Sequence, residues 1–300
     1  MTAAKPITST ARTRGKFRIR VSDILIYLAV GLFALVCLLP FLYVISISLT
    51  DPEAYVPFEF RLIPKQFSMK VYRVILSTPD FTRSLYNTAV VTLLGTPLSV
   101  FATYAFAYGL TKKDLPFRRL FLGAVIFALL FDVGLIPNYL NVRQLHLINS
   151  YWALILPALL IPYNVIVARS FLENMPAELE EAAKIDGASY FKIFFRITLP
   201  LAGASIATIS LFIAVNQWNQ YIKPLMYMTD YNMRTIQVYI KGMLVDASSG
   251  GTGVGDGDMV MPTETLRMAT VVLSILPIMC VYPFVQRYFV KGVMIGSVKG

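Results

Sequence analysis

The segment that decides the fold is charged and lies between two apolar runs. It reads Asn174-Met-Pro-Ala-Glu-Leu-Glu-Glu-Ala-Ala-Lys-Ile-Asp-Gly-Ala-Ser-Tyr-Phe-Lys-Ile-Phe-Phe-Arg-Ile-Thr-Leu-Pro200. Pro176 suits a first helical position, and the glutamates after it lie near the positive end of the helix dipole. Gly187 comes where that helix should end, in a position that favours the left-handed conformation, and Ser189 can cap a second helix after it. The segment therefore predicts two short helices joined by a tight turn.

The second of these helices has an amphipathic pattern. Its apolar residues are interleaved with Lys192 and Arg196, and they are Phe191, Phe194, Phe195 and Ile197. Such a helix lies along a membrane surface or in a groove of another protein. The residues alone leave both interpretations open.

The composition around this segment is that of a membrane protein. Of the 300 residues 56% are hydrophobic and only 15% charged, and the mean hydropathy is +0.63. The net charge of +10 does not indicate nucleic-acid binding, because the basic residues lie at the ends of apolar runs and form no long basic stripe. A lipid bilayer is the solvent that this composition fits.

Six apolar runs reach or approach the roughly 20 residues that a helix needs to cross a bilayer. They cover residues 24–49, 85–110, 120–140, 151–168, 200–221 and 266–289. We therefore expect an all-α membrane protein, with a basic amino-terminal segment at 1–23 and a six-helix domain at 24–300. The first run is too long for the apolar core of a secretory signal and is followed by no A-x-A pattern, so we expect it to stay attached.

Lysine and arginine are unequally distributed between the two sides of these spans. About 17 of them lie on the side of both termini and about 9 on the other. Positive charge is enriched in cytoplasmic segments, so the count predicts that both termini, and the segment 174–200, are cytoplasmic.

The charged segment resembles the EAA loop of permease subunits in binding-protein-dependent ABC importers. The residues that match are Glu181, Ala182, Ala183, Asp186, Gly187, Ala188, Ile197, Leu199 and Pro200. Asn87-Thr88, Trp218-Asn219 and the tail 288–300 also resemble MalG-type sugar permeases, with the tail most similar to the oligosaccharide and polysaccharide branch.

The resemblance implies a type I ABC importer permease in a bacterial cytoplasmic membrane. It implies as partners a second homologous permease, a dimer of ATP-binding subunits, and an extracytoplasmic sugar-binding protein. The matching residues would rest in a groove of the ATPase, which would bind ATP and Mg²⁺; this chain would hold no cofactor or metal and have no catalytic residue. Alternating access would then carry a saccharide inward.

Two further sets of residues suit a sugar pathway. Polar and aromatic groups near span ends fit hydroxyls and pyranose faces, although helix packing explains each of them as well; they are Asn138, Tyr139, Asn216, Trp218, Asn219 and Lys223. Lys223 keeps an acidic saccharide open as a substrate. The external glycine-rich loop 245–264, with Gly251, Gly253 and Asp256, would either contact the binding protein or be an inert linker.

Asp132 supports a rival hypothesis. It is the one acid that the sequence places inside an expected span, and an intramembrane acid is a candidate proton relay. A proton-coupled secondary transporter would use such a residue. No matching second half or repeated broken helix accompanies it.

Overall fold

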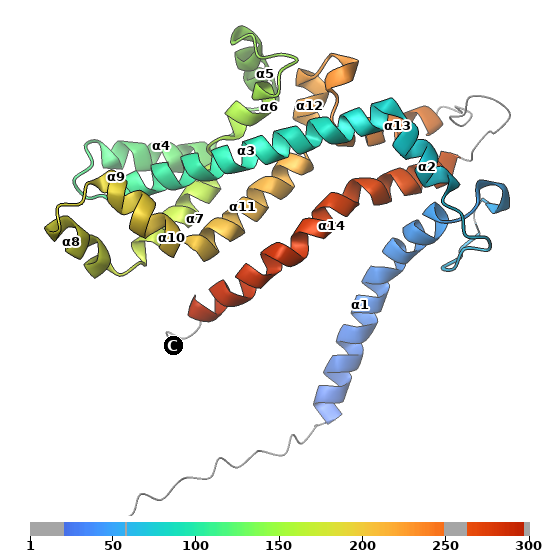
Figure 1. Ribbon diagram of the computed structural model, residues 1–300, viewed down its shortest axis with the longest axis horizontal. Helices are drawn as coiled ribbons and strands as arrows, with labels where there is room; N and C mark the ends of the chain where they lie inside the picture. Colours follow the sequence, from blue (N-terminus) through green and yellow to red (C-terminus); the bar gives the residue numbers. More distant parts are fainter. Residues whose placement is uncertain (1–20, 58, 249–262, 297–300) are drawn as a thin grey trace, which may run out of the picture.

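The computed structural model describes residues 21–57, 59–248 and 263–296 (Figure 1). Within these residues it is helical, and its only β-type pairing is an isolated bridge between Thr50 and Phe67. The helices are α1 (Val21–Ser48), α2 (Lys70–Ser77), α3 (Pro79–Thr111), α4 (Arg118–Leu130), α5 (Leu135–Gln144), α6 (Trp152–Ile155), α7 (Pro162–Glu173), α8 (Ala177–Ile185), α9 (Tyr190–Ile193), α10 (Leu199–Leu201), α11 (Gly203–Trp218), α12 (Ile222–Tyr227), α13 (Ile236–Ser248) and α14 (Thr263–Gly296).

Three of these helices, α1, α3 and α14, are long and apolar enough to span a membrane singly. The number reaches six if each of three sharply bent helix pairs counts as one span. The six-span expectation is met in this form. The third, fourth and fifth spans are bent helix pairs, whereas the sequence predicted one apolar run for each.

The third expected span, residues 120–140, is a sharply bent helix pair and not one continuous helix. α4 ends at Leu130, and α5 starts at Leu135 after a turn of 120°. Gly134 has a φ of +88°, and its backbone N–H donates to Asp132 Oδ1 at 3.0 Å. A glycine in this conformation and a short acid that caps the local backbone end the helix. Asp132 is therefore an exposed residue of the break and not a helix-interior acid.

The fourth span is also broken. α6 and the 3₁₀ turn after it (Leu156–Ala158) meet α7 at 48°, and α7 runs to Glu173, beyond the expected end at residue 168. Pro162 is the first residue of α7, and Ile161 before it is extended. A residue that precedes proline avoids the helical region, which explains the break.

α3 is the central helix of the bundle. Along its length it enters three buried clusters, through Phe81 near its start, Val91 further on, and Tyr104 near its end. The Tyr104 hydroxyl lies 2.6 Å from Ser205 Oγ of α11, which joins the two helices by a buried hydrogen bond. In Figure 1, α8, α9 and α10 gather at the carboxyl end of α3, whereas α2 and α13 lie at its amino end. α3 thus connects the two ends of the molecule.

Candidate functional site

The segment 174–200 folds as its sequence predicts, into two short helices and a turn. α8 ends at Ile185, and Gly187 has a φ of +74°, as expected for a left-handed terminator. The Ala188 N–H donates to the Ala183 carbonyl at 2.9 Å, and the Gly187 N–H donates to the Lys184 carbonyl at 3.0 Å. These paired bonds satisfy the last carbonyls of α8 and fix the direction of the chain.

The second helix begins with the expected cap. Ser189 Oγ accepts a hydrogen bond from the Lys192 N–H at 3.4 Å, and α9 continues through a π-helical turn (Phe194–Thr198) into α10. The whole helix Tyr190–Leu201 then meets α11 at 80°. One expectation is off by a residue, because Pro176 precedes α8 and the helix begins at Ala177.

We call the segment 174–201 the elbow. One side of the elbow is part of the protein's own core. Ala183, Ile193 and Phe194 are buried against Tyr108 of α3 and Leu172 of α7. Among the predicted coupling residues, Ala188, Ile197 and Leu199 are half-buried against the same cluster. The elbow therefore cannot move without displacing the spans that it packs on.

The other predicted coupling residues are exposed. They are Glu181, Ala182, Asp186, Gly187 and Pro200. Two apolar side chains outside the predicted coupling set belong to the same segment: Ile185 is 87% exposed and Phe191 is 77% exposed. Isoleucine and phenylalanine in a charged loop, flanked by Lys184, Asp186 and Lys192, were the available signal. Exposed apolar side chains in a polar segment suit contact with another protein.

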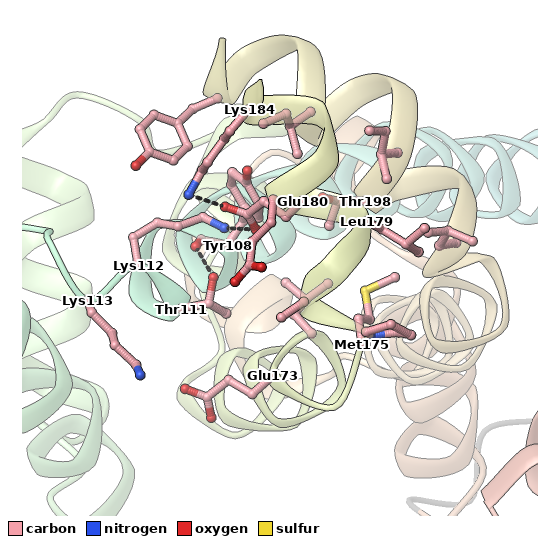
Figure 2. Close-up of a pocket in the computed structure, with 18 of the residues that line it drawn as sticks. Tyr108, Thr111, Lys112, Lys113, Glu173, Met175, Leu179, Glu180, Lys184 and Thr198 are labelled. Atoms are coloured by element: carbon pink, nitrogen blue, oxygen red, sulfur yellow. Dashed lines mark hydrogen bonds and ion pairs between the residues drawn. The ribbon is translucent and has the colours of Figure 1, made fainter. Parts of the chain in front are cut away.

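Ion pairs join the elbow to the turn after α3 (Figure 2). Glu180 accepts from Lys112 in a close ion pair and lies 3.0 Å from Lys184 Nζ. Lys112 Nζ also lies 3.9 Å from the ring centroid of Tyr108. Burial would raise the pKa of Glu180, but the two ammonium groups outweigh it and hold that pKa below its usual value. Burial lowers the pKa of Lys112 against the pull of Glu180.

A second polar contact joins α9, the other helix of the elbow, to the turn after α3. The Tyr190 hydroxyl donates to Asp114 Oδ2 at 2.8 Å, and this bond, with the Lys184 and Lys112 charges, lowers the pKa of Asp114. Between α8 and the turn after α3 lies a hollow of about 560 Å³, which these charged groups line together with apolar residues of α7 and α9. The elbow is thus held by polar contacts toward the turn after α3 and by apolar packing against the core.

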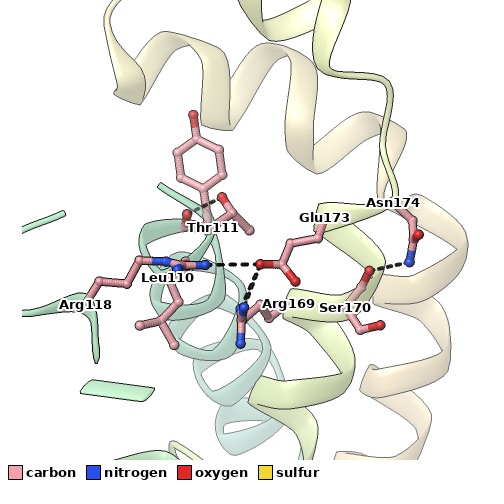
Figure 3. Close-up of polar contacts among 8 residues, drawn as sticks. Leu110, Thr111, Arg118, Arg169, Ser170, Glu173 and Asn174 are labelled. Atoms are coloured by element: carbon pink, nitrogen blue, oxygen red, sulfur yellow. Dashed lines mark hydrogen bonds and ion pairs between the residues drawn. The ribbon is translucent and has the colours of Figure 1, made fainter. Parts of the chain in front are cut away.

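The end of α7 is tied to the same turn (Figure 3). Arg118 donates to the Leu110 carbonyl at 2.8 Å and to Glu173 Oε1 at 3.3 Å. Arg169 donates to the same Glu173 oxygen at 2.7 Å. α3, α4 and α7 therefore meet in one charged junction directly beside the elbow.

The candidate sugar residues separate into three places. Asn216, Asn219 and Lys223 line one hollow of about 730 Å³ beside the end of α11. Asn138 and Tyr139 lie on α5, where Asn138 donates to the Gly134 carbonyl at 2.7 Å and the Tyr139 ring stacks on Tyr227. Trp218 is buried, and its Nε1 donates to the Ser274 carbonyl of α14 at 3.2 Å. The six residues do not form one site within this chain.

The amino end of α3 holds a buried polar junction whose geometry the sequence did not reveal. Asn87 Nδ2 donates to the carbonyls of Asn232 and Arg234 at 2.8 and 2.9 Å, and Asn87 Oδ1 accepts from the Tyr151 hydroxyl at 2.8 Å. Thr88 Oγ1 accepts from the Ile236 N–H at 2.8 Å. The Asn87-Thr88 pair therefore fastens the segment before α13 to α3.

Three other predicted site residues, Gly251, Gly253 and Asp256, lie outside the described residues, as does most of the basic segment 1–23. In the part of the chain that the structure describes, there is no group of three or more His, Cys, Asp or Glu that could hold a metal ion.

The chain is similar to known transport proteins over almost its whole length. The model of a family described as "Binding-protein-dependent transport system inner membrane component" matches residues 7–295. The polygalacturonan/rhamnogalacturonan transport system permease protein YtcP of Bacillus subtilis is 44% identical, over 94% of this chain and 99% of that protein. Protein LplC of the same organism is 40% identical, over 94% and 96%.

Two solved structures are also similar. A chain of a bacterial ABC transporter involved in the import of the acidic polysaccharide alginate has a TM-score of 0.83 and 30% identity, and the match covers 95% of this chain and all of that one. A chain of an alginate ABC transporter in complex with alginate pentasaccharide-bound periplasmic protein has a TM-score of 0.52 at 14% identity, covering 88% and 93%, and is similar in fold alone. The EAA-like elbow, the six apolar spans and these matches agree: the chain belongs to the family of inner-membrane permease components of binding-protein-dependent ABC transport systems.

Proposed function

We propose that this permease imports an acidic oligosaccharide, and that its elbow at 174–201 transmits the motion of an ATP-hydrolysing partner to the spans. Two sets of similar proteins support the substrate class. One relative is a polygalacturonan/rhamnogalacturonan permease, and one similar solved structure belongs to an importer of an acidic polysaccharide. Both are polymers rich in carboxylates.

The observation that carries the coupling role is the two-sided elbow. Ala183 and Phe194 lock it to α3, α7 and α11, while Ile185 at the tip of α8 and Phe191 on α9 stand exposed. A partner that binds the exposed residues and moves therefore displaces the spans as well, because the close-packed residues between them deform little. ATP and Mg²⁺ belong to that partner in this proposal, and the permease supplies no cofactor.

The proposed orientation puts the elbow and both termini in the cytoplasm. Seven Lys and Arg residues surround the elbow and the turn after α3, namely Lys112, Lys113, Arg118, Arg119, Lys184, Lys192 and Arg196. Their concentration at one end supports a cytoplasmic location. The opposite end, with α2, α12 and α13, then faces the sugar-binding protein.

A second permease is the expected neighbour in the membrane. α1 is apolar and exposed along most of its length in this chain, and the hollow beside α11 is lined by residues 211–223 alone. Both surfaces suit burial against lipid or against another subunit. The proton-coupled alternative loses its support, because Asp132 is an exposed cap in a helix break.

The exposed tip gives the direct test. Ile185→Asp should reduce retention of the ATPase during purification from solubilised membranes by about tenfold or more, because it places a charge in an apolar contact. The matched control is Ile63→Asp, since Ile63 is 81% exposed in the segment between α1 and α2. Full retention of the ATPase by Ile185→Asp, at equal membrane abundance, would refute the coupling role of the elbow.

A further inference from the structure

The hollow beside the end of α11 has a polar lining without acidic groups among the residues that the structure describes. Its polar residues are Asn216, Asn219, Gln220, Tyr221 and Lys223. The remaining lining residues, Leu211, Phe212, Val215 and Ile222, are apolar. The polar part of the hollow thus offers amides, one aromatic ring and one ammonium group.

Neighbouring contacts leave Asn219 and Lys223 as donors, whereas the Gln220 amide nitrogen already donates to Gln217 Oε1. Asn219 Oδ1 accepts from Gln237 Nε2 of α13 at 3.4 Å, so the Asn219 amide nitrogen is the group that remains to donate. Lys223 is half-exposed and makes no ion pair with the residues that the structure describes. Lys241 Nζ lies 5.9 Å from the centroid of the Tyr221 ring and adds a second positive charge behind it.

An unpaired ammonium group beside a membrane span needs water or an anion. An ionisable group within a span costs several kcal/mol in hydrocarbon, so it faces the bundle interior, a partner or an aqueous path (about 3 kcal/mol for lysine at mid-bilayer). The hollow is formed by one continuous stretch, residues 211–223, and its other side is open in this chain. A water-filled path that the second permease completes keeps Lys223 out of hydrocarbon and closes the open side of the hollow.

We propose that this hollow binds a carboxylate of the transported saccharide as it passes, with Lys223 as the charged partner and Asn219 as a neutral donor. This inference rests on the proposed function, since it requires an acidic sugar as the substrate. A lipid phosphate would also pair with Lys223, but the amides and the Tyr221 ring favour a sugar, whose hydroxyls need hydrogen-bond partners and whose pyranose face packs on aromatic rings. Lys223 is thus a specificity residue for charge.

The test uses the complete transporter in proteoliposomes, with trigalacturonate or its fully methyl-esterified form on the binding protein. Esterification removes the charges and keeps the rings. Lys223→Gln should lower the rate of trigalacturonate import by about tenfold, the usual effect of one lost charge-assisted hydrogen bond, and leave import of the ester unchanged. Lys223→Arg should retain most of the import of the acidic sugar. Lys65→Gln, between α1 and α2, is the control for loss of a lysine away from the hollow.

Two results would overturn the inference. One is unchanged trigalacturonate import by Lys223→Gln; the other is an equal loss for both sugars, or a loss that Lys223→Arg does not restore, which would indicate a structural role or a contact with lipid or the second permease. A wild-type complex that imports a neutral oligosaccharide but neither galacturonate probe would instead refute the acidic substrate itself.

Discussion

The two ends of α3 are fastened by different chemistry. At its carboxyl end, partly exposed polar groups hold the elbow: Lys112 binds Glu180, and Tyr190 binds Asp114. At its amino end, the buried neutral side chains of Asn87 and Thr88 bind backbone groups of residues 232–236. Exposed ion pairs are weak and easily exchanged, whereas buried polar groups are costly to leave without a partner.

This difference indicates at which end of α3 the polar contacts can be exchanged, while the apolar packing of the elbow is kept. Contacts worth about 1 kcal/mol or less each can be exchanged for contacts with a partner protein during every transport cycle. The junction of Asn87 and Thr88 instead fastens residues 232–236 to α3 through buried side chains. We therefore expect substitutions at the amino end of α3 to affect stability, and substitutions at the elbow to affect coupling.

The largest effect on stability should come from Asn87→Ala. It removes the three hydrogen bonds that the buried Asn87 side chain makes with the Asn232 and Arg234 carbonyls and the Tyr151 hydroxyl, at a cost of about 3 kcal/mol in all. Thermal unfolding of the purified complex should shift down by several degrees. Asn141→Ala, which removes an exposed amide of α5, is the control and should leave the midpoint unchanged. Equal midpoints for the two variants would show that the Asn87 junction is not a structural lock.

The close crossing of α3 and α11 should be the next most sensitive place. A Cβ added at Gly95 would lie 3.1 Å from Gln217 Nε2 and 3.4 Å from Ile155 Cγ1. Gly95→Ile should therefore destabilise the bundle by about 2 kcal/mol through overpacking. Gly109→Ala in the same helix has open space around its Cβ and should be neutral or slightly stabilising. A Gly95→Ile protein as heat-stable as the wild type would mean that the two helices do not pack this closely.

The elbow should give the smallest stability effect, and one that depends on pH. The pKa of Glu180 is lowered in the folded protein, so its contribution is present at neutral pH and is lost as the pH falls below about 5. Glu180→Gln should cost about 1 kcal/mol or less at pH 7 and nothing at acid pH. Unfolding of this variant and of Glu178→Gln, an exposed control on the same helix, is to be compared across that range. A pH-independent difference would exclude the ion pairs as its cause.

The elbow was predictable because its structure is encoded locally. Gly187 supplies a left-handed residue, Ser189 a cap, and the glutamates a favourable helix start, all within a few residues of one another. The six apolar runs were predictable for a similar reason, since crossing a bilayer needs only length and hydrophobicity. The resemblance to the permease family was likewise carried by the residues of the elbow.

Features made by distant residues were not predictable. The turn of 120° after Leu130 lies beside Gly134, and α5 packs beside α12; the span boundaries gave neither the size of this turn nor the packing. The Asn87 junction joins residues about 145 positions apart in sequence. Trp218 was assigned to a sugar path because an aromatic ring near a span end suits a pyranose face, but its indole hydrogen-bonds to α14. The side of a helix that faces its neighbours cannot be derived from span boundaries alone.

The central claim is that a rigid elbow couples ATP hydrolysis to the spans, and Gly187 tests it most directly. A side chain at Gly187 would meet no atom within 4 Å, so Gly187→Val acts through the backbone alone, at about 1–2 kcal/mol of strain at a φ of +74°. Gly187→Asn tolerates this conformation and is the conservative control. The measurement is the stimulation of ATP hydrolysis by sugar-loaded binding protein in the reconstituted complex. We expect Gly187→Val to assemble but to lose most of the stimulation while Gly187→Asn keeps it; normal stimulation in Gly187→Val would contradict the account.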